Sequence, residues 1–177
     1  MRRIVVALAI AAALFAVGYL ASPYYAFYKL EQAAKAHDRD ALEDDVDFPA
    51  LRDDFKAQIN AALLAKTGTD PHNPLVQLGL LIVPAILDRL IDSYVTPDGV
   101  ATMLTDARAP MPGNRRDPEP HGHVRFDQGY DGLGRFKVTA TEDRHPDKPL
   151  TFVLARRGLF GWKLVRIELP LQQVTSD

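Results

Sequence analysis

The sequence contains no cysteine among its 177 residues. This absence excludes structural disulfides, a thiolate nucleophile, a lipidated N-terminal cysteine and zinc sites built on thiolates. Serine is scarce, and Ser22, Ser93 and Ser176 all lie outside the Gly-x-Ser-x-Gly turn that presents a nucleophilic serine. The formal net charge is −2 and the pI is near 6.2, which gives no reason to expect the basic face that binds nucleic acid. We therefore expect neither a serine or cysteine hydrolase nor a nucleic-acid partner.

What the sequence does contain is an uncharged apolar run near its N-terminus, from Ile4 to Ala21, preceded by Arg2 and Arg3. As a helix, this run would be about 27 Å long, close to the roughly 30 Å hydrocarbon thickness of a bilayer. Residues 4–21 are therefore predicted to contact the membrane. The arginines before the run predict that the N-terminus stays inside and that the rest of the chain crosses.

A cleaved signal peptide is the alternative for residues 1–22, since it also has a basic start and an apolar core. Cleavage after Ala21 would place the bulky Tyr19 where a small residue is required, and cleavage after Ser22 would leave Pro23 directly behind the cut. The run is also longer than the roughly 7–15 residues of a usual signal core. We predict an uncleaved transmembrane anchor over residues 1–22 and a single α+β domain over residues 23–177.

The first part of that domain, residues 23–106, carries helical patterns. Asp47 and Thr96 each stand just before a proline in a first helical turn, which is typical of an N-cap. Pro84 should kink the helix that contains it, because proline lacks the backbone donor. We predict helices over residues 24–36, 40–45, 49–66, 74–91 and 97–105, the first continuous with the anchor.

The second part is predicted to be a β-meander over residues 123–170, reached through a proline-rich exposed loop over residues 107–122. There the apolar period changes from helical to two. Strands are predicted over residues 124–128, 135–142, 150–157 and 162–169, with turns at residues 129–132, 145–148 and 158–161. Because one face of the sheet is more apolar than the other, the helices should pack on it, which makes the fold class α+β with a four-stranded antiparallel sheet.

Alternation within the fourth strand assigns its side chains to the two faces of the sheet. We expect Val165, Ile167 and Leu169 to share one face, and Leu164 to point to the other with its polar neighbours. Trp162 is expected in the core.

Several sequence blocks resemble a known family. They are Ser22-Pro23-Tyr24-Tyr25 after the anchor, Leu30 to Ala36 with Asp38 and Leu42, Val46-Asp47-Phe48-Pro49 with Leu51-Arg52, and Arg157-Gly158-Leu159-Phe160-Gly161-Trp162-Lys163-Leu164. Together they are similar to DUF2939, a group of uncharacterised bacterial membrane-anchored proteins, over nearly the whole chain. The resemblance implies a Gram-negative envelope protein with a small anchored domain. With the predicted topology, we expect a single-pass protein of the bacterial inner membrane whose C-terminal domain is periplasmic. The helix-then-sheet order looks like NTF2-like or cystatin-like architectures, which host too many functions to imply one.

An acidic series lies between residues 38 and 47. It offers carboxylates for acid–base work or for calcium, although it lacks the spacing of a calcium loop. We predict that Asp47 caps a helix, that the others form a solvated face, and that Arg52 pairs with a member of the series. The carboxylates are Asp38, Asp40, Glu43, Asp44, Asp45 and Asp47.

His121 and His123 are the one closely spaced pair of histidines. Alternate residues of an extended segment can turn two imidazoles toward one cation. The surrounding prolines and the lack of an evident fixed carboxylate favour a solvated loop instead. We therefore predict no metal and no other cofactor, with these two histidines as the alternative.

The turn between the last two strands carries Phe160, which its own strands can hardly bury. Phe160 either folds onto the helices or offers an apolar anchor to a partner or to lipid. Arg156 and Arg157 beside it favour anionic headgroups if the turn reaches back to the membrane.

These features favour a non-enzymatic binding or scaffold domain that recognises a protein partner or an apolar ligand near the inner membrane. The residues expected to bind are Phe160, Arg156, Arg157, Asp47 and Arg52. The alternative is a small periplasmic hydrolase or lyase with Asp47, Arg52 or His123 in the concave face of the sheet. An enzyme needs convergent acid–base groups, and the sequence shows scattered ones.

Overall fold

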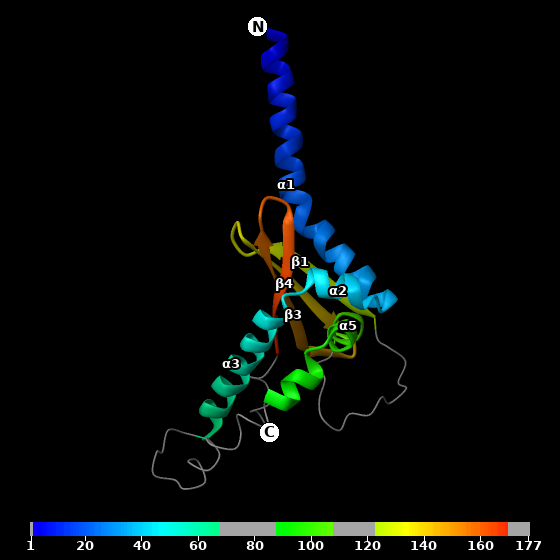
Figure 1. Cartoon of the computed structure of the whole chain (residues 1–177), viewed down its shortest axis with the longest axis vertical. Coiled ribbons are helices and arrows are strands. Elements are labelled where there is room, and N and C mark those ends of the chain that lie inside the picture. Colours follow the sequence, from blue (N-terminus) through cyan, green and yellow to red (C-terminus); the bar gives the residue numbers. More distant parts are fainter. Residues whose placement is uncertain (1, 68–87, 108–122, 170–177) are drawn as a thin grey trace.

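The computed structural model describes residues 2–67, 88–107 and 123–169 of the chain. Helices come first and strands last (Figure 1), which confirms the predicted α+β class. A helical segment over residues 88–94 precedes α5. The named elements are α1 (Arg2–Ala36), α2 (Arg39–Asp45), α3 (Phe48–Thr67), α5 (Pro97–Asp106), β1 (Val124–Tyr130), β2 (Arg135–Glu142), β3 (His145–Arg157) and β4 (Gly161–Glu168).

Helix α1 has two environments along its length. Its N-terminal part is long and apolar enough to cross a membrane, and no residue of its most apolar stretch is buried in the protein. Farther along, the side chains of Phe27, Leu30 and Ala34 are buried in the domain core. This confirms the predicted continuity of the apolar run with the first domain helix. The N-terminal helix is thus compatible with membrane anchoring, and the domain is built around its other end.

The helix boundaries follow from local signals that the sequence carries. The Asp38 side chain accepts a hydrogen bond from the Ala41 amide and starts α2. Thr96 caps α5 through the amide of Gly99. The predicted kink at Pro84 and the proline-rich loop from residue 108 to 122 lie outside the described residues.

The four strands form one antiparallel sheet in the order β1-β2-β3-β4, as a meander requires. The turn predicted at residues 145–148 is wrong, because β3 already begins at His145, which pairs with Glu142 across a two-residue turn. The pairing shifts between Ala140 and Glu142, and the ladder is irregular there. Pro146 lies in this stretch, where a missing backbone donor costs little.

A second irregularity changes which side chains of β4 face the core. Val153 pairs with Arg166 and Leu154 pairs with Leu164, so Val165 lies unpaired between them. The extra residue brings both Leu164 and Ile167 into the core and leaves Val165 half-buried. The expectation that Val165 shares a face with Ile167 and that Leu164 points to the other face is therefore wrong, whereas Trp162 is buried as predicted.

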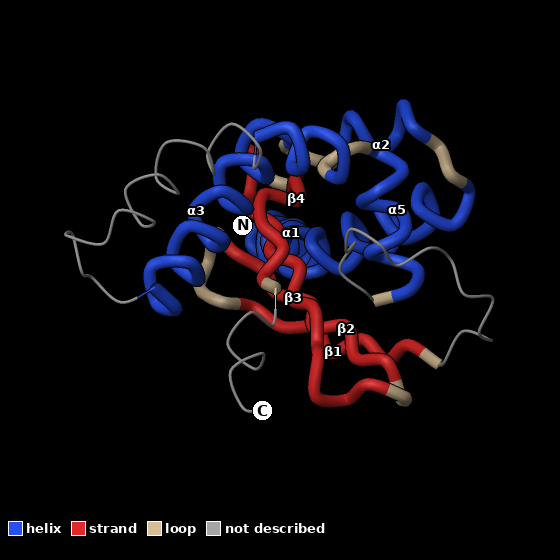
Figure 2. The backbone as a smooth tube through the Cα atoms, turned by 90° about the horizontal axis from the view of Figure 1, so that it is seen from below, coloured by secondary structure: helices blue, strands red, loops and turns tan. Residues whose placement is uncertain are grey.

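The core lies between the helices and the apolar face of the sheet. Helix α1 packs against α2, α5 and β4, and α2 also contacts β4. Seen along the long axis of the molecule, α2 and α5 gather on one side of the strands (Figure 2). The buried apolar residues of the sheet are Phe136, Val138, Ala140, Leu150, Phe152, Val153, Leu154, Trp162, Leu164 and Ile167. Helices thus cover the apolar face of the sheet, as predicted.

Helix α3 lies along the outer edge of β4 and satisfies its backbone. The Gln58 side chain donates to the Ile167 carbonyl at 2.8 Å and accepts from the Leu169 amide at 3.0 Å. Arg166 pairs with Asp54 at 2.7 Å on the same side. Gln58 therefore occupies the hydrogen-bonding position of another strand and blocks pairing with a second chain at this edge.

Truncating the buried part of α1 should weaken the whole domain. Leu30→Ala should cost about 2–5 kcal/mol of unfolding free energy, because Leu30 is fully buried and its removal leaves a cavity. Tyr28→Ala, on the exposed side of the same helix, should cost within about 0.5 kcal/mol. Trp162 fluorescence during urea unfolding of the full-length protein in mild detergent measures both. Equal losses would contradict this account of the core.

Candidate functional site

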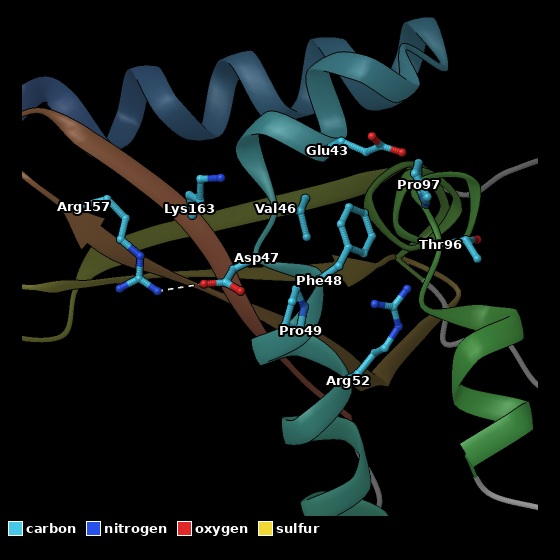
Figure 3. Close-up of a pocket in the computed structure, with 10 residues that line it drawn as sticks. All are labelled: Glu43, Val46, Asp47, Phe48, Pro49, Arg52, Thr96, Pro97, Arg157 and Lys163. Atoms are coloured by element: carbon cyan, nitrogen blue, oxygen red, sulfur yellow. Dashed lines mark hydrogen bonds and ion pairs between the residues drawn. The ribbon is translucent and has the colours of Figure 1, made fainter.

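A hollow of about 610 Å³ opens where the junction of α2 and α3 meets the start of α5 and strand β4 (Figure 3). Its floor is apolar and its rim carries charges of both signs. It brings together three of the residues that the sequence singled out, Asp47, Arg52 and Arg157. The lining residues are Glu43, Val46, Asp47, Phe48, Pro49, Arg52, Thr96, Pro97, Arg157 and Lys163.

Asp47 joins α3 to the sheet. Its Oδ1 accepts from the Ala50 amide at 3.2 Å, the predicted N-cap bond of α3. Its Oδ2 accepts from Arg157 Nη2 at 2.9 Å, and its own amide donates to the Leu164 carbonyl at 2.8 Å. The hydrogen bond from Arg157, together with that from Ala50, holds the pKa of the Asp47 carboxyl below its ordinary value. Asp47 is therefore a stable anion and a weak proton acceptor.

Arg52 holds the segment before α5 against α3. Its Nη2 donates to the Val95 carbonyl at 3.2 Å, and its Nε lies 3.3 Å from Asp92 Oδ1. The guanidinium also lies over the Phe48 ring, 5.9 Å from its centroid. The predicted pairing of Arg52 with the acidic series is therefore wrong, because its partner follows forty residues later in the sequence.

The acidic series itself is spread over several structural roles. Asp38 caps α2, and Asp45 pairs with Lys29 of α1 at 2.9 Å. The hydrogen bond to Asp45 raises the pKa of the Lys29 ammonium above its ordinary value, against a smaller lowering by burial. Asp40, Glu43 and Asp44 are exposed, as the predicted solvated face requires, whereas Asp38 and Asp45 have structural roles that were not predicted. In the described part of the chain these carboxylates do not converge with Asp47 on one site.

The rim of the hollow retains one cation without an ion-pair partner among the described residues. Lys163 is half-buried on β4, and its charge adds to that of Arg157 in lowering the pKa of Asp47. Across the hollow, Glu43 is exposed. Val46, Phe48 and Pro97 supply apolar surface between them. Such a mixture suits recognition of a group that has both an apolar part and an anionic part.

Phe160 and Arg156 lie apart from the hollow, where the turn between β3 and β4 meets α1. The Phe160 ring packs edge-on against Phe15, with centroids 5.5 Å apart, and lies 6.5 Å from Tyr19. The Arg156 guanidinium is stacked 3.8 Å from the Tyr19 centroid and 4.3 Å from that of Trp162. Phe160 thus contacts the apolar run of α1, yet its side chain remains 47% exposed.

The Ser22-Pro23 step provides a second link between α1 and the sheet, beside the Phe160 contact. Pro23 cannot donate to the carbonyl of Tyr19, four residues earlier in the helix. The Ser22 hydroxyl donates to that carbonyl instead, at 2.8 Å, and accepts from Trp162 Nε1 at 2.9 Å. The Ser22 hydroxyl therefore satisfies the carbonyl that Pro23 leaves without a donor, and it also links the sheet to α1. This role of Ser22 was not predicted from the sequence, although a serine and a proline directly after the apolar run were the available signal.

The histidines do not form a site in the described residues. His123 is exposed just before β1, and His121 lies outside the described residues. No group of three potential metal ligands occurs in the part of the chain that the structure describes. His121 and His123 as metal ligands remain an untested alternative.

Removing the charge of Asp47 should change how stability depends on pH. The folded pKa lies below the ordinary value of 3.8, so the unfolded chain binds the proton first as the pH falls. The ion pair therefore contributes its full stability above about pH 4 and loses it as the pH falls through the lower folded pKa. Asp47→Asn, which keeps the cap, should be about 0.2–1 kcal/mol less stable near neutral pH, with a difference that fades in acid.

Urea unfolding at several pH values measures this difference. Asp147→Asn is the matched control, because Asp147 is exposed at the other end of β3. A stability gap between wild type and Asp47→Asn that persists unchanged in acid would contradict the ion pair.

Comparison with known proteins places the chain in a family of undefined activity. A family described as a protein of unknown function (DUF2939) matches residues 12–103. The matched residues include the later part of the apolar run, α2, α3 and the start of α5, and they end before the sheet. No curated protein and no solved structure matches the chain. The NTF2-like or cystatin-like architecture therefore stays a prediction.

Proposed function

The chain belongs to the DUF2939 family, and we propose that it is a single-pass protein of the bacterial inner membrane whose periplasmic domain binds an envelope protein through the hollow. The single observation that carries this proposal is that α1 is at once the apolar helix and a core element of the domain. A domain built on its anchor keeps a fixed height and orientation over the membrane. Holding a binding surface near the membrane raises the effective concentration for partners there.

The composition of the hollow favours a protein segment as its occupant. Phe48 and Pro49 offer apolar contact area, while Lys163 offers a positive charge that has no ion-pair partner among the described residues. Of the two lining carboxylates, Asp47 is already neutralised by Arg157. An acidic segment with an apolar side chain would complement this surface. We therefore propose that the partner presents such a segment.

The same contacts argue against the hydrolase or lyase alternative. Asp47 is held as an anion by two donors, and Arg52 is engaged by Asp92 and Val95. His123 precedes β1, three strands away from β4, which is about 14 Å at the usual strand spacing. A general acid and a general base would need to lie within hydrogen-bond reach of one substrate, and these three residues do not meet that requirement.

The contacts of α1 also support an uncleaved anchor. The turn between β3 and β4 packs on Phe15 and Tyr19, and the Tyr130 hydroxyl donates to the Leu20 carbonyl at 2.9 Å. Cleavage after Ala21 would remove all three partners. We therefore predict that the intact mass of the protein purified from membranes includes residues 1–21. A mature mass that lacks them would contradict the anchor.

The partner should be lost when the charge of the hollow is reversed. We predict that the full-length protein, purified from cross-linked cells in mild detergent, carries a defined envelope protein. Lys163→Glu should weaken this complex at least tenfold, since like charges placed together cost more than about 1.4 kcal/mol. Lys148→Glu, an exposed site at the other end of β3, is the matched control and should retain the partner.

Trp162 fluorescence confirms that both variants are folded before the comparison is made. Recovery of the same proteins with Lys163→Glu and with Lys148→Glu would overturn the hollow as the binding surface. The absence of any enriched protein from the wild type would overturn the binding function itself.

A further inference from the structure

The turn between β3 and β4, residues 158–160, lies beside the apolar run of α1 rather than beyond its end. Phe160 contacts Phe15 and Tyr19, which both precede Ala21, the last residue of the run. At the helical rise, Tyr19 lies about 3 Å and Phe15 about 9 Å before Ala21. Figure 1 shows this turn reaching along α1 toward its N-terminal part. If the run spans the bilayer, the turn lies at the depth of lipid.

Apolar side chains gather on this end of the sheet. Leu159 is 62% exposed at the tip of the β3–β4 turn, and Leu133 is 79% exposed in the β1–β2 turn, residues 131–134. Of the large apolar side chains that are exposed outside α1 in the described residues, only Leu90 lies elsewhere than on these two turns. Clustered exposure of this kind marks a surface that is covered in the working protein.

Arg156 satisfies the backbone of both turns. Its Nη1 donates to the Leu159 carbonyl at 2.6 Å, and its Nε donates to the Leu133 carbonyl at 3.1 Å. Its amide donates to the Gly134 carbonyl at 2.9 Å. Backbone carbonyls that enter lipid must find donors within the protein, because no water is there to supply them. One arginine thus joins the two turns and supplies donors to carbonyls of both.

The side chains around Arg156 are those of a membrane interface. Trp162 and Tyr19 enclose its guanidinium, and Tyr24, Tyr25 and Tyr28 are exposed on the next turns of α1. Tryptophan and tyrosine concentrate at the level of the headgroups, where one end of the ring is apolar and the other is wet. The aromatic residues that mark the interface along α1 therefore begin at the level of the two turns and continue beyond it toward the domain.

We propose that the tips of the β1–β2 and β3–β4 turns insert into the membrane leaflet next to the domain, with Leu133, Leu159 and Phe160 among the lipid chains and with Asp131, which pairs with Arg135 and Lys137, at the level of the headgroups. The ligand of this surface is the bilayer itself. The inference rests on the anchoring part of the proposed function and is independent of the hollow and its partner. With two attachments, α1 and the sheet, the domain cannot turn about the helix axis.

Site-specific fluorescence tests this insertion directly, because the chain has no cysteine to remove. Leu159→Cys, Leu133→Cys and the control Lys148→Cys are each labelled with NBD in the full-length protein. The labelled proteins are reconstituted into vesicles of phosphatidylethanolamine and phosphatidylglycerol. All three positions are exposed, so the labels need not disturb the core.

We expect the NBD emission at positions 159 and 133 to shift to the blue and to lose quenching by aqueous iodide, relative to position 148. Lipids with a nitroxide near the headgroup should quench these two labels more strongly than lipids with a nitroxide at the chain end. Iodide quenching at 159 and 133 equal to that at 148 would overturn the insertion.

Flotation of the same vesicles separates the possible failures. Protein that floats with water-exposed turn labels overturns the insertion alone and leaves the anchor in place. Protein that stays behind when the vesicles float overturns the anchor, and the insertion with it. If the turn labels are inserted but no partner is captured, the proposed binding function of the hollow is overturned and the insertion is supported.

Discussion

The contact between α1 and the sheet at Pro23 holds the two halves of this molecule together. The Ser22 hydroxyl supplies the hydrogen bond that Pro23 cannot give to Tyr19, and the same hydroxyl binds the indole of Trp162. Arg156 then stacks between the Tyr19 and Trp162 rings. Every residue of α1 that is buried in the core lies at this point or beyond it. The orientation of the domain relative to its apolar helix is therefore set by this small group of side chains.

Features that depend on neighbours in sequence were predictable, and features that depend on distant partners were not. The caps at Asp38, Asp47 and Thr96 mark helix starts because a side chain bonds to an amide two or three residues on. The face assigned to Val165 was wrong, and so was the predicted start of the third strand. Both depend on shifts in strand pairing, which are set by how whole strands align. The alternation of apolar residues within one strand does not indicate where a bulge will shift its pairing.

The same distinction holds for the candidate site. Asp47 was recognised as a cap, yet its ion pair joins residues 110 positions apart and leaves no local pattern. Arg52 was expected to pair with a nearby carboxylate, but its partner Asp92 lies in a segment that only the tertiary fold brings close. For Phe160 the sequence left two environments open, and the structure places the ring against Phe15 with part of it still exposed.

The charges behind the turns limit how deeply the proposed insertion can go. Gly158 alone separates Leu159 from Arg157 in the chain, and the Arg157 side chain is bonded to Asp47. Transfer of the Leu159 and Phe160 side chains out of water is favourable, because it lowers the free energy. Taking Arg157 and Asp47 out of water would instead cost several kcal/mol for each ion. The free-energy change of insertion therefore turns from favourable at Leu159 to unfavourable at Arg157. For this reason the sheet enters the leaflet only by its turns. The hollow beside Asp47 then stays in water, where a segment of a partner can reach it.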